Sequence, residues 1–356
     1  MIKKILLASP RGFCAGVDRA IDVVETALEI FGPPVFVKHA IVHNIHVVSD
    51  LKKKGAIFVE DLDEIHSPSV FDPEVLDSEA RTRRAQTRRA DGSILIFSAH
   101  GTDPKIKEEA RLRGHRVIDA TCPLVTKVHL EAQRYAKEGY YIIYIGHRGH
   151  PEPIGVFGEV PKEAITLIER ADEVESLKVP QEEKIIYLTQ TTLSVSDTKE
   201  TIKRLRKRFP NIISPPSADI CYATTNRQMA ARRLAQKSDL VLVLGSRTSS
   251  NSKRLVEVCR EEGIKTYLVD DEKMINPKWL DKVEVLGITS GASAPEYLVT
   301  RLVDFVKRDN PGAKVENLDV FKEKIKFPLP DDLVPLAHQS TKGILWVEKH
   351  KVATQR

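Results

Sequence analysis

The thiols of Cys14, Cys122 and Cys221 are the side chains of this sequence best suited to hold a metal centre. Each follows a strand-like run or its turn and precedes a helix-like stretch, at similar intervals along the chain. A helix N-terminus stabilises a thiolate, so three convergent thiolates could hold an iron–sulfur cluster with one iron left without a protein ligand. That iron could bind a substrate oxygen as a Lewis acid. Because the sequence has no Cys-x-x-Cys pair, zinc-ribbon and ferredoxin spacings are excluded, and free core thiols are the alternative.

A second group of side chains, in loops that follow strand-like runs, has the chemistry of an anion site. Imidazoles and hydroxyls donate to phosphate oxygens, and GSRTSSNS leads into a helix whose N-terminus favours an anion. Since no Walker-type Gly-Lys-Ser/Thr is present, a buried diphosphate pocket fits better than a nucleotide cradle. Taken singly, each residue is more often a surface group, a cap or a turn residue. The candidates are His43, His100, His150, Ser249, Ser250, Asn251 and Ser293.

Glu152 is the one carboxylate inside these loops, directly after His150 and Pro151. A carboxyl group near a buried anion has a raised pKa and can deliver a proton at neutral pH. On its own it would be interpreted as a solvent-facing acid. The loops all follow strands, and the carboxyl ends of parallel strands form ligand sites, so we expect one shared site.

Short aliphatic runs alternate with amphipathic stretches and predict the elements that position these loops. The runs are nearly continuous in Val, Ile and Leu, as in parallel sheets covered on both faces. Strands are expected at Ile5–Ala8, Val35–Lys38, Ile94–Ser98, Tyr141–Ile145, Ile185–Thr189, Leu240–Leu244, Thr266–Val269 and Val285–Ile288. Helices are expected at Val17–Phe31, Thr126–Lys137, Asp197–Arg208, Asn226–Gln236 and Ser252–Glu262.

The repeated strand-then-helix order predicts an α/β fold of three similar modules, each a small, mostly parallel sheet flanked by helices. We expect modules at 1–120, 121–220 and 221–310, followed by a Lys- and Pro-rich tail at 311–356. An insertion at about 66–90 interrupts the first module. Its arginines, with few apolar anchors, favour a solvated surface over a binding patch.

Composition narrows the class of protein. The 356 residues are 41% hydrophobic and 29% charged, with a mean hydropathy of −0.26, as in globular chains. The sequence has no apolar run near the ~20 residues of a membrane-spanning helix and no secretory N-terminal segment, which predicts a cytoplasmic protein without a membrane partner. A net charge of +5, not clustered, argues against nucleic acid.

The fourth cysteine, Cys259, is expected to differ from the other three. It lies on an apolar helical stripe with Leu255, Val256 and Val258, which predicts a core position. Disulfides are not expected in so long a chain without a secretion signal.

Taken in order, these loops resemble the hydroxymethylbutenyl diphosphate reductases, the IspH or LytB family. The resemblance covers about residues 1–310, with a weaker continuation to about Pro330. It is carried by the strings PRGFCAGVDRAI, IVHN, FSAHG, DATCPLVTKVH, GHPE, TQTTLSV, DICYATTNRQ, SSNSKRL and GASAPE.

The resemblance implies an oxidoreductase of isoprene biosynthesis. The family removes the allylic hydroxyl of 4-hydroxy-3-methylbut-2-enyl diphosphate with two electrons and two protons. The products are isopentenyl and dimethylallyl diphosphates and water, in the last step of the non-mevalonate (MEP/DOXP) pathway. The implied fold is a trefoil around a central cavity. The implied electron donor is a ferredoxin or flavodoxin, which the Arg-rich insertion could dock.

The resemblance also implies roles for the candidate residues. Cys14, Cys122 and Cys221 correspond to the ligands of an oxygen-sensitive [4Fe–4S] cluster, which could lose one iron in air and become [3Fe–4S]. The histidines, serines and Asn251 named above correspond to the diphosphate site. Glu152 corresponds to the proton-delivery acid, and Thr191 to the hydroxyl that helps to relay the proton.

Two functions of other classes remain as alternatives. One is a phosphohydrolase that uses a mononuclear metal on the same histidines, with the cysteines in the core. The other is a diphosphate-binding protein without catalysis.

Overall fold

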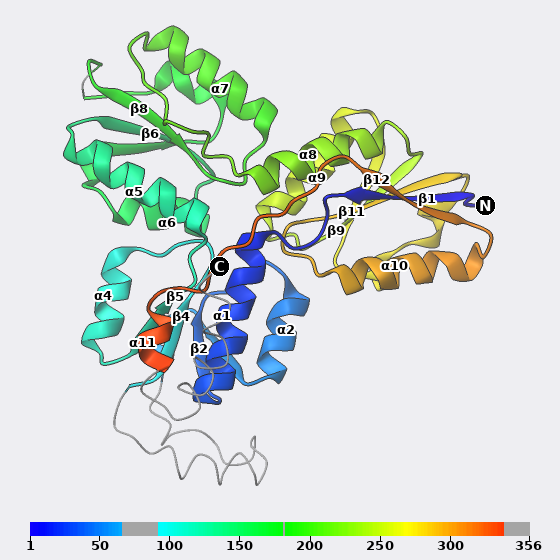
Figure 1. Ribbon diagram of the computed structural model, residues 1–356. Coiled ribbons are helices and arrows are strands. Elements are labelled where there is room, and N and C mark those ends of the chain that lie inside the picture. The colour runs from blue at the N-terminus through cyan, green and yellow to red at the C-terminus, as the bar shows by residue number, and fades with distance from the viewer. Residues whose placement is uncertain (66–91, 181, 338–356) are drawn as a thin grey trace.

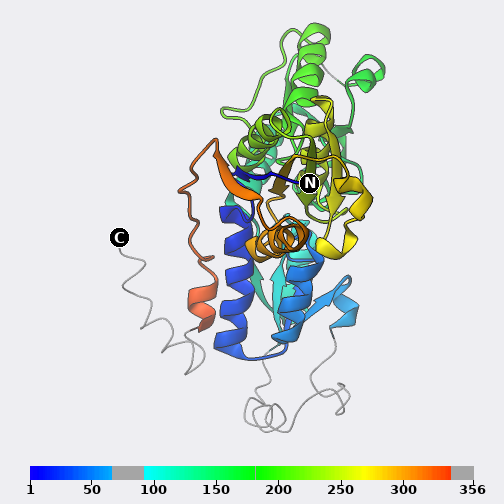
Figure 2. The ribbon, with the colours of Figure 1, turned by 90° about the vertical axis from the view of Figure 1, so that its right-hand side faces the viewer.

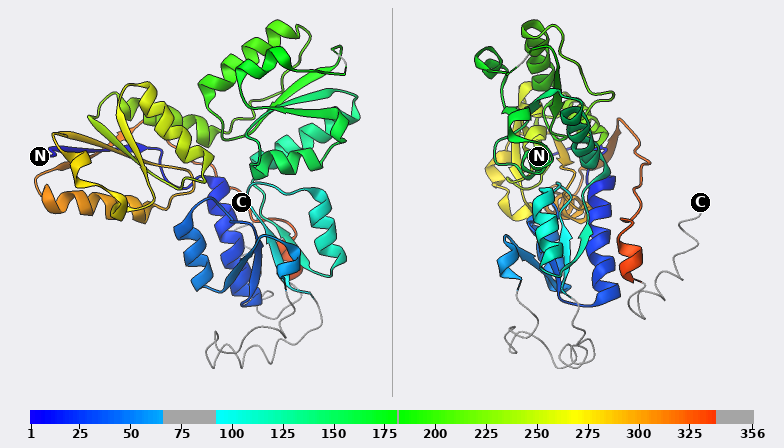
Figure 3. Two further views of the ribbon diagram at one scale, coloured as in Figure 1. Left: turned by 180° about the vertical axis from the view of Figure 1, so that it is seen from behind. Right: turned by 90° about the vertical axis from the view of Figure 1, so that its left-hand side faces the viewer.

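The computed structural model places three α/β lobes around a common centre (Figures 1 and 3). It describes residues 1–65, 92–180 and 182–337. Each lobe holds one sheet, and the neighbouring strands pair in parallel throughout the three sheets of the described chain. The predicted α/β trefoil of parallel sheets is therefore confirmed. The Arg-rich insertion lies outside the described residues.

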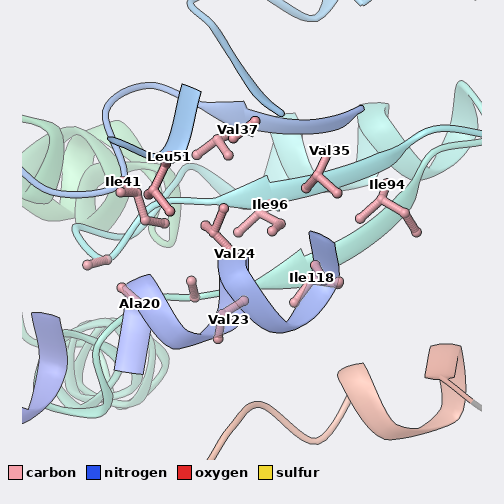
Figure 4. Packing of buried hydrophobic residues seen from close by; sticks show 14 of the residues in the cluster. Ala20, Val23, Val24, Val35, Val37, Ile41, Leu51, Ile94, Ile96 and Ile118 are labelled. Atoms are coloured by element: carbon pink, nitrogen blue, oxygen red, sulfur yellow. The ribbon is translucent and has the colours of Figure 1, made fainter. Parts of the chain in front are cut away.

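The first lobe is built on a sheet of order β3-β2-β4-β5. Helices α1 and α2 pack on one face and α4 on the other. Figure 4 shows the α1 face, where Ala20, Val23 and Val24 lie against aliphatic side chains of β2 and β4. Each fully buried Val or Ile there contributes about 1.5–3 kcal/mol of transfer free energy. The bounds are α1 Ala15–Phe31, β2 Val35–Lys38, α2 Ile45–Lys53, β3 Ala56–Val59, β4 Ile94–Phe97, α4 Pro104–Leu112 and β5 Arg116–Asp119.

The second lobe has a sheet of order β7-β6-β8. Helices α5 and α6 supply the core of one face, with Val128 and Val156 fully buried. Helix α7 covers the other face through Leu205. The bounds are α5 Pro123–Lys137, β6 Tyr141–Ile145, α6 Pro151–Gly158, β7 Ile165–Ile168, β8 Ile185–Thr189 and α7 Val195–Arg208.

The third lobe has a sheet of order β10-β9-β11-β1-β12, with α8 and α9 on one face and α10 on the other. The helix bounds are α8 Tyr222–Ala235, α9 Ser250–Glu261 and α10 Glu296–Asp309, and α11 follows at Leu333–Ala337 beside α1. The strand bounds are β1 Lys4–Ser9, β9 Leu240–Leu244, β10 Lys265–Val269, β11 Val285–Ser290 and β12 Lys314–Asp319.

Strand pairing corrects the expected assignment of segments to sheets in two places. Strand β1 does not join the first sheet but pairs with β11 and β12 in the third. Residues 314–319, expected to be part of a tail, form β12 at the edge of that sheet. Both strands are held by main-chain hydrogen bonds to partners about 300 residues away in sequence, which local patterns do not report. The expected module boundaries remain predictions.

The other strands that the sequence analysis missed, β3, β5 and β7, are also edge strands. They are four residues long and only partly buried. Strand β5 lacks a continuous apolar run, whereas β3 and β7 each carry a short one. The expected helices are confirmed, with starts two to four residues earlier than predicted. Within the described ranges, every helix is too short or too polar to cross a membrane.

Candidate active site

The three cysteines expected to act together each stand at the N-cap of a helix: Cys14 before α1, Cys122 before α5 and Cys221 before α8. Pro123 opens α5, where its missing N–H costs no hydrogen bond. A Cβ atom added at Gly16 would lie 2.6 Å from the Cys122 Sγ and 3.9 Å from the Cys14 Sγ. A glycine in α1 therefore allows two thiols from different helices to approach each other. We call these three cysteines the thiol trio.

Electrostatics connects the members of the thiol trio. Burial raises the pKa of Cys122 to about 12 and of Cys221 to about 11, and it also raises the pKa of Cys14. A negative charge on Cys14 contributes to the first two increases. Helix N-termini were expected to favour thiolates, and their backbone N–H groups do lower these pKa values. Desolvation is the largest cause at each thiol, and it outweighs these N–H groups and, at Cys14, the charge of Arg227.

Cys259 differs, as expected. It is fully buried within α9, packed with Leu255 and Val258, and its thiol donates to the backbone oxygen of Ala231. The prediction of a core cysteine is confirmed.

His43, His100 and His150, from the loops after β2, β4 and β6, form a compact imidazole trio. The rings of His43 and His100 stack with centroids 4.1 Å apart, and His150 stands edge-on at 5.5 and 5.9 Å from them. Burial lowers the pKa of His43 to about 4, that of His150 to about 3 and that of His100 well below its ordinary value. All three are therefore neutral at pH 7.

Two contacts define what the imidazole trio can offer a ligand. The His150 Nδ1 accepts a hydrogen bond from the Glu152 backbone N–H at 3.2 Å, so its hydrogen is assigned to Nε2. The His43 Nε2 is buried and has no hydrogen-bond partner among the described residues. Such an atom is costly unless a ligand supplies the partner.

The serines and the asparagine gather at the N-terminus of α9. Ser249 is the N-cap, and Ser250 and Asn251 form the first turn, with side chains at least nine-tenths buried. The Asn251 Oδ1 accepts from the Ala292 backbone N–H, which leaves its buried Nδ2 without a partner in the described chain. Ser293 donates to the His43 backbone oxygen at 3.0 Å and thereby joins the third lobe to the imidazole trio.

Glu152 is in the first turn of α6 rather than in a loop, because His150 caps that helix and Pro151 opens it. Its side chain is 1% exposed. The Thr191 backbone N–H donates to Oε1 at 2.6 Å and the Thr191 hydroxyl to Oε2 at 3.0 Å. Burial raises the pKa of Glu152 to about 8 in spite of these hydrogen bonds. The direction agrees with the expectation; desolvation is the largest cause, and the negative charge of Asp219 adds to it.

Hydrogen bonds join the separate parts into one site. Thr191, at the end of β8, binds Glu152 with its side chain and backbone N–H, and its carbonyl accepts from the Cys221 backbone N–H at 3.1 Å. The Ser250 hydroxyl donates to the Thr192 carbonyl at 3.4 Å. Glu152 is thus connected to the imidazole trio through His150, to the thiol trio through Thr191, and by way of Thr192 to the N-terminus of α9.

Three cations of the site were missed in the sequence analysis. Arg19 and Arg227 follow Cys14 and Cys221 on the same helices, and both are at least nine-tenths buried. The charge of Lys253 lowers the pKa of His43 and of His150. Arginines and lysines on amphipathic helices are usually interpreted as surface charges, and no local signal distinguishes a buried one.

A site for one metal ion on the histidines has no support here. In residues 1–65, 92–180 and 182–337, no group of three or more His, Cys, Asp and Glu side chains is arranged to hold a single ion. The histidines contact one another through ring faces and edges instead.

Known proteins resemble the chain over nearly its whole length. Curated 4-hydroxy-3-methylbut-2-enyl diphosphate reductases from Acidothermus cellulolyticus and Tropheryma whipplei are 48% and 49% identical to it. They cover 96% and 94% of this chain, which in turn spans 95% and 98% of them.

Solved structures agree. The E-1-hydroxy-2-methyl-but-2-enyl-4-diphosphate reductase of Plasmodium falciparum matches 95% of this chain and 99% of its own, with 38% identity and a TM-score of 0.85. A solved (E)-4-hydroxy-3-methyl-but-2-enyl diphosphate reductase matches 86% of this chain and 100% of its own, with 28% identity and a TM-score of 0.58. A family model described as LytB protein matches residues 5–307. The chain belongs to the LytB protein family.

Proposed function

We infer that this chain reduces 4-hydroxy-3-methylbut-2-enyl diphosphate. Two electrons and two protons remove the allylic hydroxyl as water and yield isopentenyl or dimethylallyl diphosphate, the terminal step of the non-mevalonate pathway. One geometric observation carries this function best. Glu152, a buried acid with a pKa of about 8, is hydrogen-bonded between an imidazole trio suited to phosphate and a thiol trio suited to iron.

The thiol trio fits an iron–sulfur cluster. Three buried thiols without enough countercharge resist deprotonation, and cationic iron would supply the missing charge. Cys14, Cys122 and Cys221 would hold a [4Fe–4S] cluster, or [3Fe–4S] after damage by air. When bound, such a cluster supplies the electrons and an iron without a protein ligand that acts as a Lewis acid.

The imidazole trio and the N-terminus of α9 would bind the diphosphate. The Nε2–H of His150, the unpartnered Nδ2 of Asn251 and the helix N-terminus provide donors that carry no net charge. Neutral donors hold the diphosphate without neutralising it, so its charge favours the protonated form of Glu152. The remaining diphosphate ligands in this proposal are His43, His100, Ser249, Ser250 and Ser293.

Glu152 would deliver a proton with the help of Thr191. A neutral carboxyl group can donate from Oε2 to the Thr191 Oγ1, which then directs its own hydrogen toward the substrate hydroxyl. The departing hydroxyl takes one proton and leaves as water, and a carbon of the allyl group takes the other, whichever of the two products forms. The Thr191 backbone N–H fixes the orientation of the carboxyl group at Oε1.

The electrons would come from a ferredoxin or flavodoxin. The insertion that carries Arg81, Arg83 and Arg84 lies outside the described residues, and an acidic carrier that docks there remains our hypothesis. Unchanged electron transfer after these arginines are neutralised would refute it. The cytoplasmic location also stays a prediction.

The test is anaerobic. The protein is reconstituted with iron and sulfide, given reduced viologen, and supplied with 4-hydroxy-3-methylbut-2-enyl diphosphate. We expect substrate-dependent viologen oxidation that disappears in Cys14→Ser and persists in the core variant Cys259→Ser. Phosphate release without reductant would instead favour the hydrolase. Substrate binding without turnover, with the cluster present, would favour a non-catalytic binding protein.

A further inference from the structure

The chain after β12 connects the third lobe with the first along a path that passes the cysteine loops. Val320 donates its backbone N–H to the Ser9 carbonyl at 3.0 Å, and no helix or strand follows until α11 begins at Leu333. This part, residues 320–333, runs beside α1 (Figures 1 and 2). Leu333 is fully buried in the core that α1 forms with the first sheet. We call residues 320–333 the C-terminal segment.

Glu323 of the C-terminal segment forms an ion pair with Arg227 of α8. Both Glu323 oxygens accept from the Arg227 Nη1 at 3.1 Å, and Asn226 donates to the same carboxylate at 3.0 Å. The side chains are 1% exposed for Arg227 and 15% exposed for Glu323. A guanidinium buried to this degree depends on its carboxylate, because an unpaired buried charge is strongly destabilising.

The remaining hydrogen bonds of Arg227 hold the backbone beside two cysteines. Its Nε and Nη2 donate to the Gly12 carbonyl at 3.2 and 3.0 Å, and Nη2 also donates to Phe13 at 3.2 Å, immediately before Cys14. Its Nη1 donates to the Ala223 carbonyl at 3.1 Å, two residues after Cys221. Arg227, itself on the helix that Cys221 caps, therefore joins that helix to the loop of Cys14 and to the C-terminal segment.

The third cysteine loop is joined to the same segment by Arg19 of α1. Its Nε donates to the Pro328 carbonyl at 2.6 Å and its Nη1 to the Thr121 carbonyl at 3.0 Å, directly before Cys122. In addition, Asp332 accepts from the Asp119 backbone N–H at 3.2 Å, at the end of β5. The segment thus reaches all three members of the thiol trio, each through backbone next to the cysteine.

We propose that the C-terminal segment 320–333 holds the three cysteine loops in register for the iron–sulfur cluster, with Glu323, Arg227 and Arg19 as positioning residues. The inference rests on the proposed function, in which these thiols bind the cluster. The three loops belong to different lobes and converge without a continuous sheet between them. Buried arginines that bind the loops and the segment together supply the missing connection.

The first experiment compares Glu323→Gln with Glu316→Gln in the full chain. Glu316, on β12, forms an exposed pair with Lys4 at 3.0 Å and is a matched control outside the segment. Both variants are reconstituted anaerobically, and the loss of cluster absorbance is followed after a chelator is added. We expect about tenfold faster loss for Glu323→Gln, because its partner charge becomes unpaired, and the wild-type rate for Glu316→Gln.

The reduction potential of the cluster distinguishes a direct electrostatic effect of Glu323 and Arg227 from a general loss of stability around the cysteines. Glu323→Gln removes a negative charge near Cys14 and should shift the potential upward, whereas Arg227→Gln removes a positive charge and should shift it downward. Both variants should lose the cluster faster. Shifts of the same sign in both would refute the assigned roles.

Amide hydrogen exchange of the apoprotein tests the contacts without the cluster. We expect Glu323→Gln to accelerate exchange in residues 12–14 and Glu316→Gln to leave it unchanged. Wild-type exchange and wild-type cluster retention in Glu323→Gln would overturn the proposal. If that variant does not fold, Arg227→Gln/Glu323→Gln replaces it, because no buried charge is then unpaired. The double variant also lacks the hydrogen bonds of Arg227 to Gly12 and Phe13, so it should still lose the cluster faster and exchange faster in residues 12–14. A wild-type chain that binds no cluster would refute the proposed function instead, and the exchange result would still stand.

Discussion

The thiol trio and the imidazole trio both consist of half-buried residues, and desolvation acts on their pKa values in opposite directions. It raises the pKa of Cys122 to about 12 and lowers the pKa of His150 to about 3. Both trios are consequently uncharged near pH 7 in the protein alone. Each trio is therefore suited to bind a ligand of a different charge. The thiols require a cation before they can deprotonate, whereas neutral imidazoles can donate to an anion without a countercharge.

Glu152 follows the same rule from a position between the two. Its desolvated carboxyl group is held neutral up to about pH 8 by burial. An acid that keeps its proton at neutral pH is what a reduction that consumes protons requires. Substitutions at these residues test how desolvation suits each group to its role.

The largest effect is expected from removal of one thiol. Cys122→Ser replaces a proposed ligand sulfur with a poor ligand and should leave almost no intact cluster after reconstitution. Iron, sulfide and visible absorbance measure this directly. Cys259→Ser, which removes a buried thiol from the core of α9, should keep the wild-type content. Equal content in both variants would contradict the role of the thiol trio.

Loss of the buried acid should come next. Glu152→Gln preserves shape and one acceptor but cannot release a proton, and turnover should fall about 10²–10⁴-fold. Cluster content and substrate affinity should remain near wild type. The control is Glu138→Gln at the exposed end of α5, where turnover should not change. Normal turnover of Glu152→Gln would remove this residue from proton delivery.

A negative charge placed at Asn251 tests whether neutral donors bind the diphosphate. Asn251→Asp exchanges an unpartnered N–H donor for a carboxylate, which repels a diphosphate. We expect KM to rise about 10–100-fold, the range of a hydrogen bond to a charged group, with a smaller change in kcat. Asn276→Asp is the control, because aspartate can still cap the Lys278 backbone N–H. An unchanged KM for Asn251→Asp would exclude contact with the diphosphate.

A smaller effect is expected from Thr191→Val. The backbone N–H of residue 191 still orients Glu152, and only the hydroxyl contact is lost. Turnover should fall about tenfold, as for one hydrogen bond of 1–1.5 kcal/mol, and Thr191→Ser should restore most of it. Steady-state kinetics with reduced viologen measures both. A valine variant as active as the serine variant would exclude the relay.

The last prediction concerns the stability of the fold rather than turnover. Glu152 has a pKa of about 8 in the folded protein against an ordinary value of 4.5. Between these pH values the folded state binds a proton that the unfolded state releases, so its stabilising contribution is complete below pH 4.5 and declines toward pH 8. The free energy of urea unfolding of the apoprotein should therefore fall with pH more steeply in wild type than in Glu152→Gln. Parallel pH profiles would contradict the raised pKa.

Local sequence patterns predicted the central strands well. All strands interior to the three sheets were expected, because strands covered on both faces carry continuous aliphatic runs. They are β1, β2, β4, β6, β9 and β11. The position of Cys14, Cys122 and Cys221 shortly before a helix was also predicted, since a strand-like run followed by an amphipathic stretch is a local signal. The edge strands β5 and β12 were missed because they have no continuous apolar run, and β3 and β7 were missed although each carries a short one.

The sequence by itself determined the α/β class, the central strands, the three cysteines at helix starts and the order of the polar loops. Each of these depends on residues close together along the chain. Tertiary structure alone decided that β1 pairs with β11 and β12, that Arg227 is buried against Glu323, and that Glu152 meets Thr191. It also decided the charge states, because desolvation depends on what covers a side chain after distant segments have packed.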